Sequence, residues 1–210
     1  MKVYQVPREW PGQTVFIVCG GPSVADVDLG VLHGRRVIVI NSSLHAVPWA
    51  DFLFFGDWRW WNEGENQKAA LAFRGRIVTT SRMVGHPRVL VCRKTNPPGL
   101  AVVNDSLMQK WTSLTAATNL AAHLVGPGGT IVWLGADGRI APDGRTHHHK
   151  PHRWPHKPGC YDMQLADLRT IVPSLRTLGI AAYNASPVTA WTNLLPVVPL
   201  NELLDERCAA

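Results

Sequence analysis

A histidine-rich segment in the second half of the chain contains the residue types with the most evident chemistry. His147, His148 and His149 are consecutive, and they stand in a stretch that is otherwise rich in cations and prolines. Imidazole titrates near neutral pH, so one of these side chains could remove a proton from an attacking hydroxyl group. Because consecutive residues of an extended loop point in alternating directions, the three rings cannot all face one acceptor. The triplet therefore predicts a single general base.

The spacing of the neighbouring residues leaves a metal site open as a second interpretation. Four possible zinc ligands stand four residues apart, namely His148, His152, His156 and Cys160. On a helix this spacing would align the ligands, but Pro151, Pro155 and Pro158 would break such a helix. A loop could still bring three of the four side chains around one zinc ion.

Charge gives a third interpretation of the same segment. Only Asp143 opposes its five cations, which are Arg139, Arg145, Lys150, Arg153 and Lys157. A basic segment of this kind suits phosphate or nucleic acid. We favour the catalytic and electrostatic interpretations together, in which residues 138–158 form a basic flap over a phosphate site without metal ligands. The acceptor or phosphate is then bound by Arg145, His152, Arg153 and Lys157.

A second candidate site lies near the start of the chain. The apolar run Thr14–Val18 has the length of a buried parallel strand, and it leads into Gly20-Gly21-Pro22-Ser23. The glycines permit a turn with close approach to the backbone, Pro22 suits the start of a helix, and Ser23 with Asp26 fits a capping box. A glycine turn before a helix offers backbone N–H groups to an anion, so a phosphate site is predicted here, with a purely structural turn as the alternative.

Other apolar runs also end in small or polar residues. Asn41 and Asp57 follow the second and third runs, and Gly135 and Asp137 follow a later one. The carboxyl ends of parallel strands meet at one edge of a sheet, so these residues and the glycine turn predict a crevice for a nucleotide. We count Asp137 with the catalytic candidates, because an acidic residue at this edge would face the crevice.

Strands and helices are expected to alternate along the chain. Apolar runs predict strands at 14–18, 36–41, 52–55, 77–80, 89–92, 130–134 and 180–184. Spacing and composition predict helices at 24–32, 62–72, 112–125, 161–178 (interrupted at Pro173) and 201–207. The stretch 93–110 is expected to be a loop. This alternation predicts an α/β fold, a three-layer Rossmann-like domain with a mainly parallel sheet.

Composition sets the remaining bounds. The 210 residues, 46% of them apolar and 17% charged, suit one globular domain over 1–210. No apolar run approaches the ~18 residues of a membrane span, and no signal-peptide core is present, so we expect a cytoplasmic protein without a membrane partner. Four scattered cysteines indicate thiols, and a net charge of +6 favours phosphorylated or polyanionic partners.

The nine tryptophans include a local cluster. Trp58, Trp60 and Trp61 fall within four residues, too close together for all three to face one core. An exposed aromatic ring beside basic residues can stack on bases or sugars. The alternative is an aromatic cluster that packs at the edge of the core.

Three blocks of sequence, in order, resemble a known group of enzymes. Gly20-Gly21-Pro22-Ser23 is similar to the turn after the first strand in bacterial sialyltransferases with a Rossmann-like domain. It also resembles that turn in the MptE-like family, which includes 6-hydroxymethylpterin diphosphokinases and many phage-encoded proteins. Thr112-Ser113-Leu114 with the later Gly135-Ala136-Asp137 looks like the second shared block. Tyr183-Asn184-Ala185-Ser186-Pro187 resembles the closing block.

The resemblance implies positions for several residues. It implies that Gly21-Pro22-Ser23 lies by the donor phosphates, that Asn41 lies near the ribose or base, and that Thr112-Ser113 opens a helix near phosphate. A histidine after the Gly-x-Asp motif would activate the acceptor hydroxyl, and Tyr161 is the candidate for a tyrosine near the leaving phosphate. Leu114 stands where the sialyltransferases have glycine, so the resemblance implies a nucleotide-binding frame and not a particular CMP-sugar.

The leading hypothesis is a nucleotide-dependent, glycosyltransferase-like enzyme. It would move a group from a nucleotide-activated donor to a hydroxyl acceptor, with a histidine base and no obligatory metal. The first alternative is a Mg²⁺-dependent pyrophosphokinase for a hydroxymethyl heterocycle, with the ion held by Asp57 and Asp137. The second is a nucleic-acid-binding module without catalysis. The two kinds merge in an enzyme that modifies bases in phage DNA, because it would need both a donor pocket and a basic surface.

Overall fold

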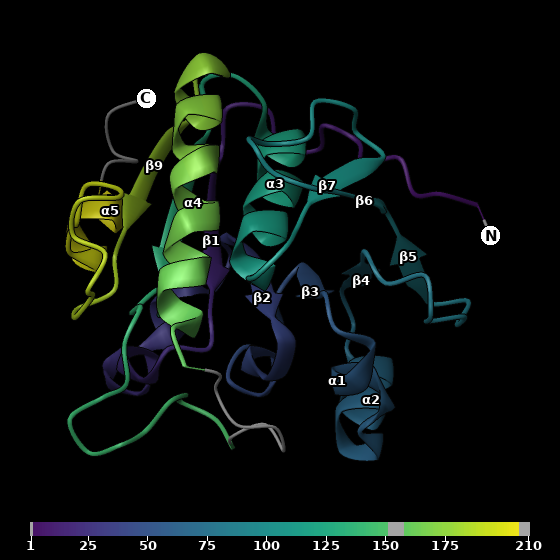
Figure 1. Cartoon of the computed structure of the whole chain (residues 1–210), viewed down its shortest axis with the longest axis horizontal. Helices are drawn as coiled ribbons and strands as arrows, with labels where there is room; N and C mark the ends of the chain where they lie inside the picture. Colours follow the sequence, from purple (N-terminus) through teal and green to yellow (C-terminus); the bar gives the residue numbers. More distant parts are fainter. Residues whose placement is uncertain (1, 151–157, 206–210) are drawn as a thin grey trace.

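A seven-stranded sheet forms the centre of the computed structural model, which describes residues 2–150 and 158–205 (Figure 1). Its strand order is β5-β4-β3-β2-β1-β8-β9, and all neighbouring strands are parallel. The strands are β1 (Thr14–Val18), β2 (Arg36–Ile40), β3 (Phe52–Phe55), β4 (Arg76–Thr79), β5 (Val89–Val91), β8 (Thr130–Leu134) and β9 (Ala181–Asn184). The predicted α/β, Rossmann-like fold is therefore confirmed.

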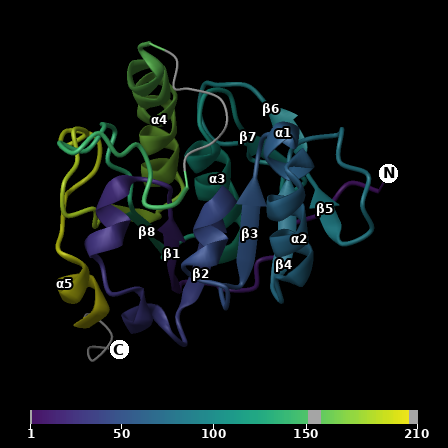
Figure 2. The same cartoon turned by 90° about the horizontal axis from the view of Figure 1, so that it is seen from below.

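The strands are apolar along their whole length because both faces of the sheet are covered. Ile17 and Trp133 point to the face on which α3 (Ser113–Val125) and α4 (Cys160–Thr177) pack side by side. Phe16 and Val18, which alternate with Ile17 along β1, point to the opposite face. That face is covered by α1 (Trp58–Asn62), α2 (Gly64–Ala72) and α5 (Leu200–Asp205), together with the short 3₁₀ helices (Figure 2).

The order of the strands reverses at the centre of the sheet. From β1 the chain adds β2, β3, β4 and β5 in one direction, and then returns to place β8 and β9 on the other side of β1. The connections that leave β1 and β8 therefore diverge to opposite faces, which opens a crevice at their carboxyl ends. The sequence predicts the nucleotide crevice at this edge of the sheet.

The helix predicted near the first turn differs from the observed structure. The expected helix 24–32 is two 3₁₀ helices, η1 (Pro22–Asp26) and η2 (Leu29–Leu32), because the Asp28 carboxylate accepts a hydrogen bond from the Gly30 N–H and starts a second helix. A third, η3 (Asn41–His45), follows β2 directly. The predicted capping box is wrong. Gly21 is the N-cap of η1, and the Ser23 hydroxyl bonds elsewhere.

The stretch 93–110 is not a loop throughout. It contains β6 (Arg93–Thr95) and β7 (Ser106–Met108), which form a separate two-stranded parallel sheet. These strands are three residues long, and β6 is polar, so no apolar run reveals them. Helix α4 is continuous through Pro173, and its apolar residues Leu168 and Leu175 are buried against the sheet. No helix in the described ranges is long and apolar enough to cross a bilayer.

The tryptophan cluster divides between the core and the surface. Trp60 and Trp61 are buried and lie against Phe55, whereas Trp58 is exposed. The Trp60 indole N–H donates to the Ser42 hydroxyl, which satisfies its polar edge. The prediction that all three rings could not enter one core is confirmed.

Candidate functional site

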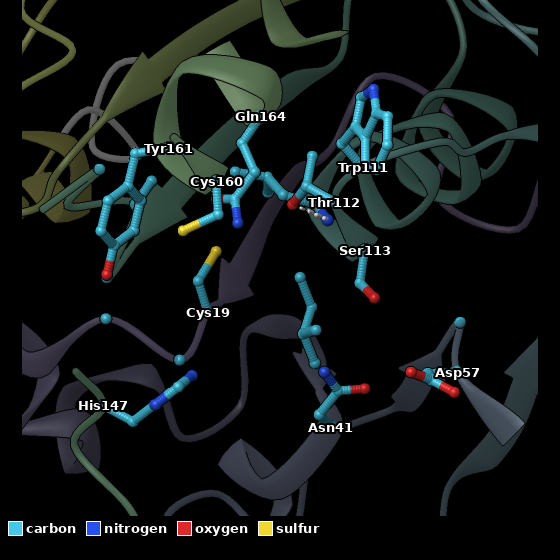
Figure 3. A pocket seen from close by; sticks show the side chains of 18 of the residues that line it. Cys19, Asn41, Asp57, Trp111, Thr112, Ser113, His147, Cys160, Tyr161 and Gln164 are labelled. Atoms are coloured by element: carbon cyan, nitrogen blue, oxygen red, sulfur yellow. Dashed lines mark hydrogen bonds between the residues drawn. The ribbon is translucent and has the colours of Figure 1, made fainter. Parts of the chain in front are cut away.

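A cavity of about 570 Å³ opens at the carboxyl edge of the sheet. Its walls come from the ends of β1, β2, β3 and β8, from the segment before α3, from the first turn of α4 and from the histidine segment. Figure 3 shows Cys19, His147, Cys160 and Tyr161 on one side, called here the histidine side. Asn41, Asp57 and Ser113 lie on the other, the asparagine side.

Most of the predicted site residues line this cavity. They are Gly20, Gly21, Asn41, Asp57, Thr112, Ser113, Gly135, Asp137, His147, His149 and Tyr161. Pro22 and Ser23 are buried behind the wall, and Arg145 is exposed and bonded to Asp143. His152, Arg153 and Lys157 lie outside the described residues.

The turn after β1 is closed by the protein's own groups. Both oxygens of the buried Asp137 carboxylate bond Ser23: Oδ1 accepts from the hydroxyl at 2.6 Å and Oδ2 accepts from the backbone N–H at 2.8 Å. The Gly21 N–H donates to the Gly135 carbonyl. The sequence predicts that N–H groups at the start of η1 bind a phosphate, but the N–H of Ser23 is already bonded to Asp137. Burial raises the pKa of Asp137, and the bonds from Ser23 oppose this rise.

The two glycines of this turn are needed for different contacts. A Cβ on Gly21 would overlap the Gly135 carbonyl oxygen and lie 2.7 Å from the Asp137 carboxyl carbon. A Cβ on Gly20 would lie 3.0 Å from the ring of His147 and 3.3 Å from that of His149. Gly21 thus permits the close packing of the β1 and β8 turns, while Gly20 forms the surface on which the histidines rest.

The three histidines point in alternating directions, as predicted. His147 and His149 line the cavity, with their rings stacked at a centroid distance of 4.8 Å. His148 points away from it, and its Nε2 lies 3.0 Å from the Ser43 hydroxyl, which itself donates to the Cys19 carbonyl. Burial, with a smaller contribution from His149, lowers the pKa of His148 to about 4. His148 is therefore a neutral anchor for the histidine segment.

The protonation of His149 can be assigned from its neighbour. Its Nδ1 lies 2.9 Å from the Lys150 carbonyl oxygen, which can only accept a hydrogen bond. In the neutral ring Nδ1 therefore carries the proton, and Nε2 carries the lone pair. Nε2 is the atom that lies over Gly20, at the wall of the cavity. His147 is held through its Nδ1 by Thr146, at 2.9 Å.

Helix α3 begins at the cavity wall. The Thr112 side chain caps it by accepting a hydrogen bond from the Leu114 N–H at 3.1 Å, and Ser113 follows as the first helical residue. The backbone before the helix is fixed too, because the Trp111 N–H donates to the buried Asp167 carboxylate of α4 at 2.6 Å. Figure 3 shows the Ser113 hydroxyl directed into the cavity on the asparagine side.

Asn41 has two unusual features at the end of β2. It is the only residue other than glycine with a positive φ, +52°, among those that the structure describes. Its Oδ1 is buried and has no hydrogen-bond partner within the described residues. A non-glycine residue in this conformation is strained, and a buried acceptor without a partner is costly, so both features indicate a group reserved for a ligand.

The two carboxylates proposed for Mg²⁺ are not brought together. Asp57 follows β3 and Asp137 follows β8, three strands away, a separation of about 14 Å at the usual strand spacing. Asp57 bonds Arg59 through both oxygens, and Asp137 bonds Ser23. They do not fit one metal site. For zinc, no group of three ligands forms within residues 2–150 and 158–205, and His152 and His156 of that hypothesis lie outside them.

Further cations and aromatic rings complete the cavity wall. The cations are Arg59, Lys94, Lys110 and Arg139, of which only Arg139 was noted as part of the basic flap. Gln109 is held by the Thr80 hydroxyl and packs on Gly56, where a Cβ would overlap it. Trp58, Trp111 and Trp191 also line the wall, as does Tyr161, whose pKa is raised by burial to about 12, so its hydroxyl stays protonated at neutral pH.

Comparisons with known proteins add no assignment to this geometry. A scan against protein-family models, a search of curated proteins and a search of solved structures each give no significant match.

Proposed function

We propose that this protein is a nucleotide-dependent transferase, glycosyltransferase-like, which moves a group from a nucleotide-activated donor to a hydroxyl acceptor. The observation that supports this proposal best is the position of the cavity. It has about 570 Å³, a size that suits a small organic ligand, and it spans the switch point between β1 and β8. Doubly wound sheets bind nucleotides in this crevice. The resemblance of three sequence blocks to nucleotide-using enzymes points to the same chemistry.

In this proposal the donor lies on the asparagine side. Asn41 Oδ1 accepts a hydrogen bond from the ribose or the base, which relieves the cost of an unpaired buried acceptor. The phosphate lies toward Ser113 at the start of α3, where the helix dipole stabilises the charge that develops as the phosphate leaves.

The acceptor hydroxyl lies on the histidine side. As its oxygen bonds the transferred group, the bond from that group to the phosphate oxygen breaks, and the hydroxyl proton passes to a histidine. His149 suits this role because Nε2 carries its lone pair, and His147 is the second candidate because its ring is stacked on His149. His148 cannot touch the substrate, since it is bonded to Ser43 behind the wall.

The proposal is tested first by binding. A thermal-shift screen with nucleoside mono- and diphosphates and nucleotide sugars should find one nucleotide class that stabilises the protein by about 3 kcal/mol at 100 times its Kd. Release of free nucleotide from the selected donor then provides an activity assay. If no nucleotide stabilises the protein, the proposal is wrong.

Histidine variants then test the mechanism. Either His149→Ala or His147→Ala should reduce the rate by about 10²- to 10⁴-fold, with an unchanged donor Kd, because the base acts on the acceptor. His45→Ala, on an exposed histidine that does not line the cavity, is the control and should keep full activity. Full activity in both cavity variants would remove histidine from the mechanism.

A further inference from the structure

The mouth of the cavity has two exposed tryptophans. Trp58 is 39% exposed and Trp111 is 47% exposed, whereas Trp60 and Trp191 of the same cavity are buried. Trp58 begins α1 at the end of β3, and Trp111 precedes α3, so they come from distant parts of the sequence. Exposed indole rings bury large apolar area when a flat partner stacks on them.

Both tryptophans stand on fixed backbone. The N–H of Trp111 is bonded to the carboxylate of Asp167, which is only 4% exposed. Trp58 follows Asp57, whose carboxylate caps α1 by accepting a hydrogen bond from the Arg59 N–H at 2.9 Å. A ring on a rigid backbone loses little conformational entropy when a ligand stacks on it, which favours a role in binding.

Exposed cations accompany these rings. Lys110 Nζ lies 5.8 Å from the centre of the Trp111 ring, and Lys94 and Arg59 line the same cavity. Arg59 is paired with Asp57, but neither Lys94 nor Lys110 has an ion-pair partner among the described residues. Aromatic platforms interleaved with cations are the surface on which proteins bind single-stranded nucleic acid.

We infer that this rim, formed by Trp58, Arg59, Lys94, Lys110 and Trp111, binds a single-stranded nucleic acid. Its phosphates lie along the lysines, its bases stack on the indole rings, and one nucleotide reaches across to the histidine side of the cavity as the acceptor. This inference rests on the proposed function, and it adds the class of acceptor. A base inside a duplex could not reach the cavity, which is why the strand must be single or locally opened.

Fluorescence anisotropy of the full chain with a labelled single-stranded oligonucleotide tests the inference. Trp111→Ala should weaken binding by about 5- to 100-fold, the range for loss of one stacked base. Lys110→Ala should reduce the slope of log K against log salt by about 0.7, as expected for one lost phosphate contact. Trp49→Ala and Arg74→Ala are matched controls, because both residues precede the amino ends of strands, at the opposite edge of the sheet.

Two results would overturn the inference. One is equal affinity of the Trp111→Ala and Trp49→Ala variants for the strand, since stacking would then play no part. The other is that heparin displaces the strand and that alanine at either rim tryptophan leaves the affinity unchanged. The site would then recognise a polyanion by charge alone and would not bind bases. Thermal stabilisation by nucleotides, measured in the same variants, distinguishes a failure of strand binding from a failure of the proposed donor site. Strand binding without any nucleotide stabilisation would reject the donor site and leave the rim intact.

Discussion

The turn after β1 and the segment before α3 both bring a helix start to the carboxyl edge of the sheet, but their polar groups are used differently. At the turn, the Ser23 N–H and hydroxyl are both bonded to Asp137, and the Gly21 N–H is bonded to Gly135. Before α3, the internal bonds fix the backbone through Thr112 and Asp167.

This difference shows that the strongest sequence motif need not supply the groups that remain exposed at the cavity. The glycine turn is the stronger sequence signal, yet its N–H and hydroxyl groups bond the carboxylate of Asp137. The turn therefore serves to join the ends of β1 and β8. The segment before α3 has no motif beyond Thr112-Ser113, yet it exposes Lys110 and Trp111 beside the cavity. A helix start that is already bonded to the protein's own carboxylate has less capacity left for a ligand.

The largest effect is expected from a methyl group on Gly21. Gly21→Ala should lower the free energy of unfolding by about 3 kcal/mol, because the added carbon meets backbone of the β8 turn, which cannot move aside cheaply. Gly85→Ala is the control, since a Cβ there has nothing within 4 Å. Urea denaturation measures both variants. Equal stability of the two would mean that the turn is open, and the contrast with α3 would disappear.

The next effect is expected at the carboxylate that closes the turn. Asp137→Asn should lower the free energy of unfolding by about 1–3 kcal/mol, because the amide NH₂ would face a donor of Ser23. Asp143→Asn is a suitable comparison, since Asp143 is exposed and its change should cost less than about 0.5 kcal/mol. If Asp137→Asn is as stable as wild type but loses nucleotide binding, Asp137 belongs to the ligand site and not to the closure of the turn.

The half-buried His148 makes the stability of the protein depend on pH. Its pKa in the folded state, about 4, lies below the ordinary value of 6.5, so the neutral form is stabilised. The contribution to stability is complete above pH 6.5 and is lost as the pH falls toward 4. Chemical denaturation between these pH values should show a shallower loss of stability in His148→Gln than in wild type. His45→Gln, at an exposed histidine, should follow wild type. Parallel curves for all three proteins would contradict the anchor role.

The sequence predicted the sheet well because its strands are buried on both faces and therefore appear as uninterrupted apolar runs. It also predicted that Asn41, Asp57 and Asp137 would lie at one edge of the sheet, which follows from parallel strands alone, although it did not show that Asp57 and Asp137 are three strands apart. Residues that entered the cavity from irregular segments were missed. Gln109 and Trp111 follow the short strand β7, and nothing in their local pattern shows that this strand packs beneath α3.

The partners of the site residues could not be predicted either. Ser23 and Asp26 have the spacing of a capping box, but Ser23 lies 114 residues from the carboxylate that it bonds. The alternating directions of the three histidines could be predicted, because side chains alternate along an extended loop. The contact of His148 with Ser43 could not, because it spans 105 residues. Pairings over such distances depend on the packing of β1 against β8, which local patterns do not encode.

The smallest change in stability is expected at Asn41. Variants of this residue also give the sharpest test of the asparagine side of the cavity. Asn41→Gly removes the left-handed strain and the unpaired buried oxygen, so the free energy of unfolding should rise by about 0.5 kcal/mol although glycine makes the unfolded chain more flexible. Asn41→Ala keeps the strain without the amide, and should lose about 1 kcal/mol. Both variants should bind the nucleotide about tenfold more weakly, because the same hydrogen bond is lost. Denaturation and nucleotide titration of the pair therefore separate conformation from recognition, and unchanged affinity in both variants would show that the unpaired oxygen does not serve the ligand.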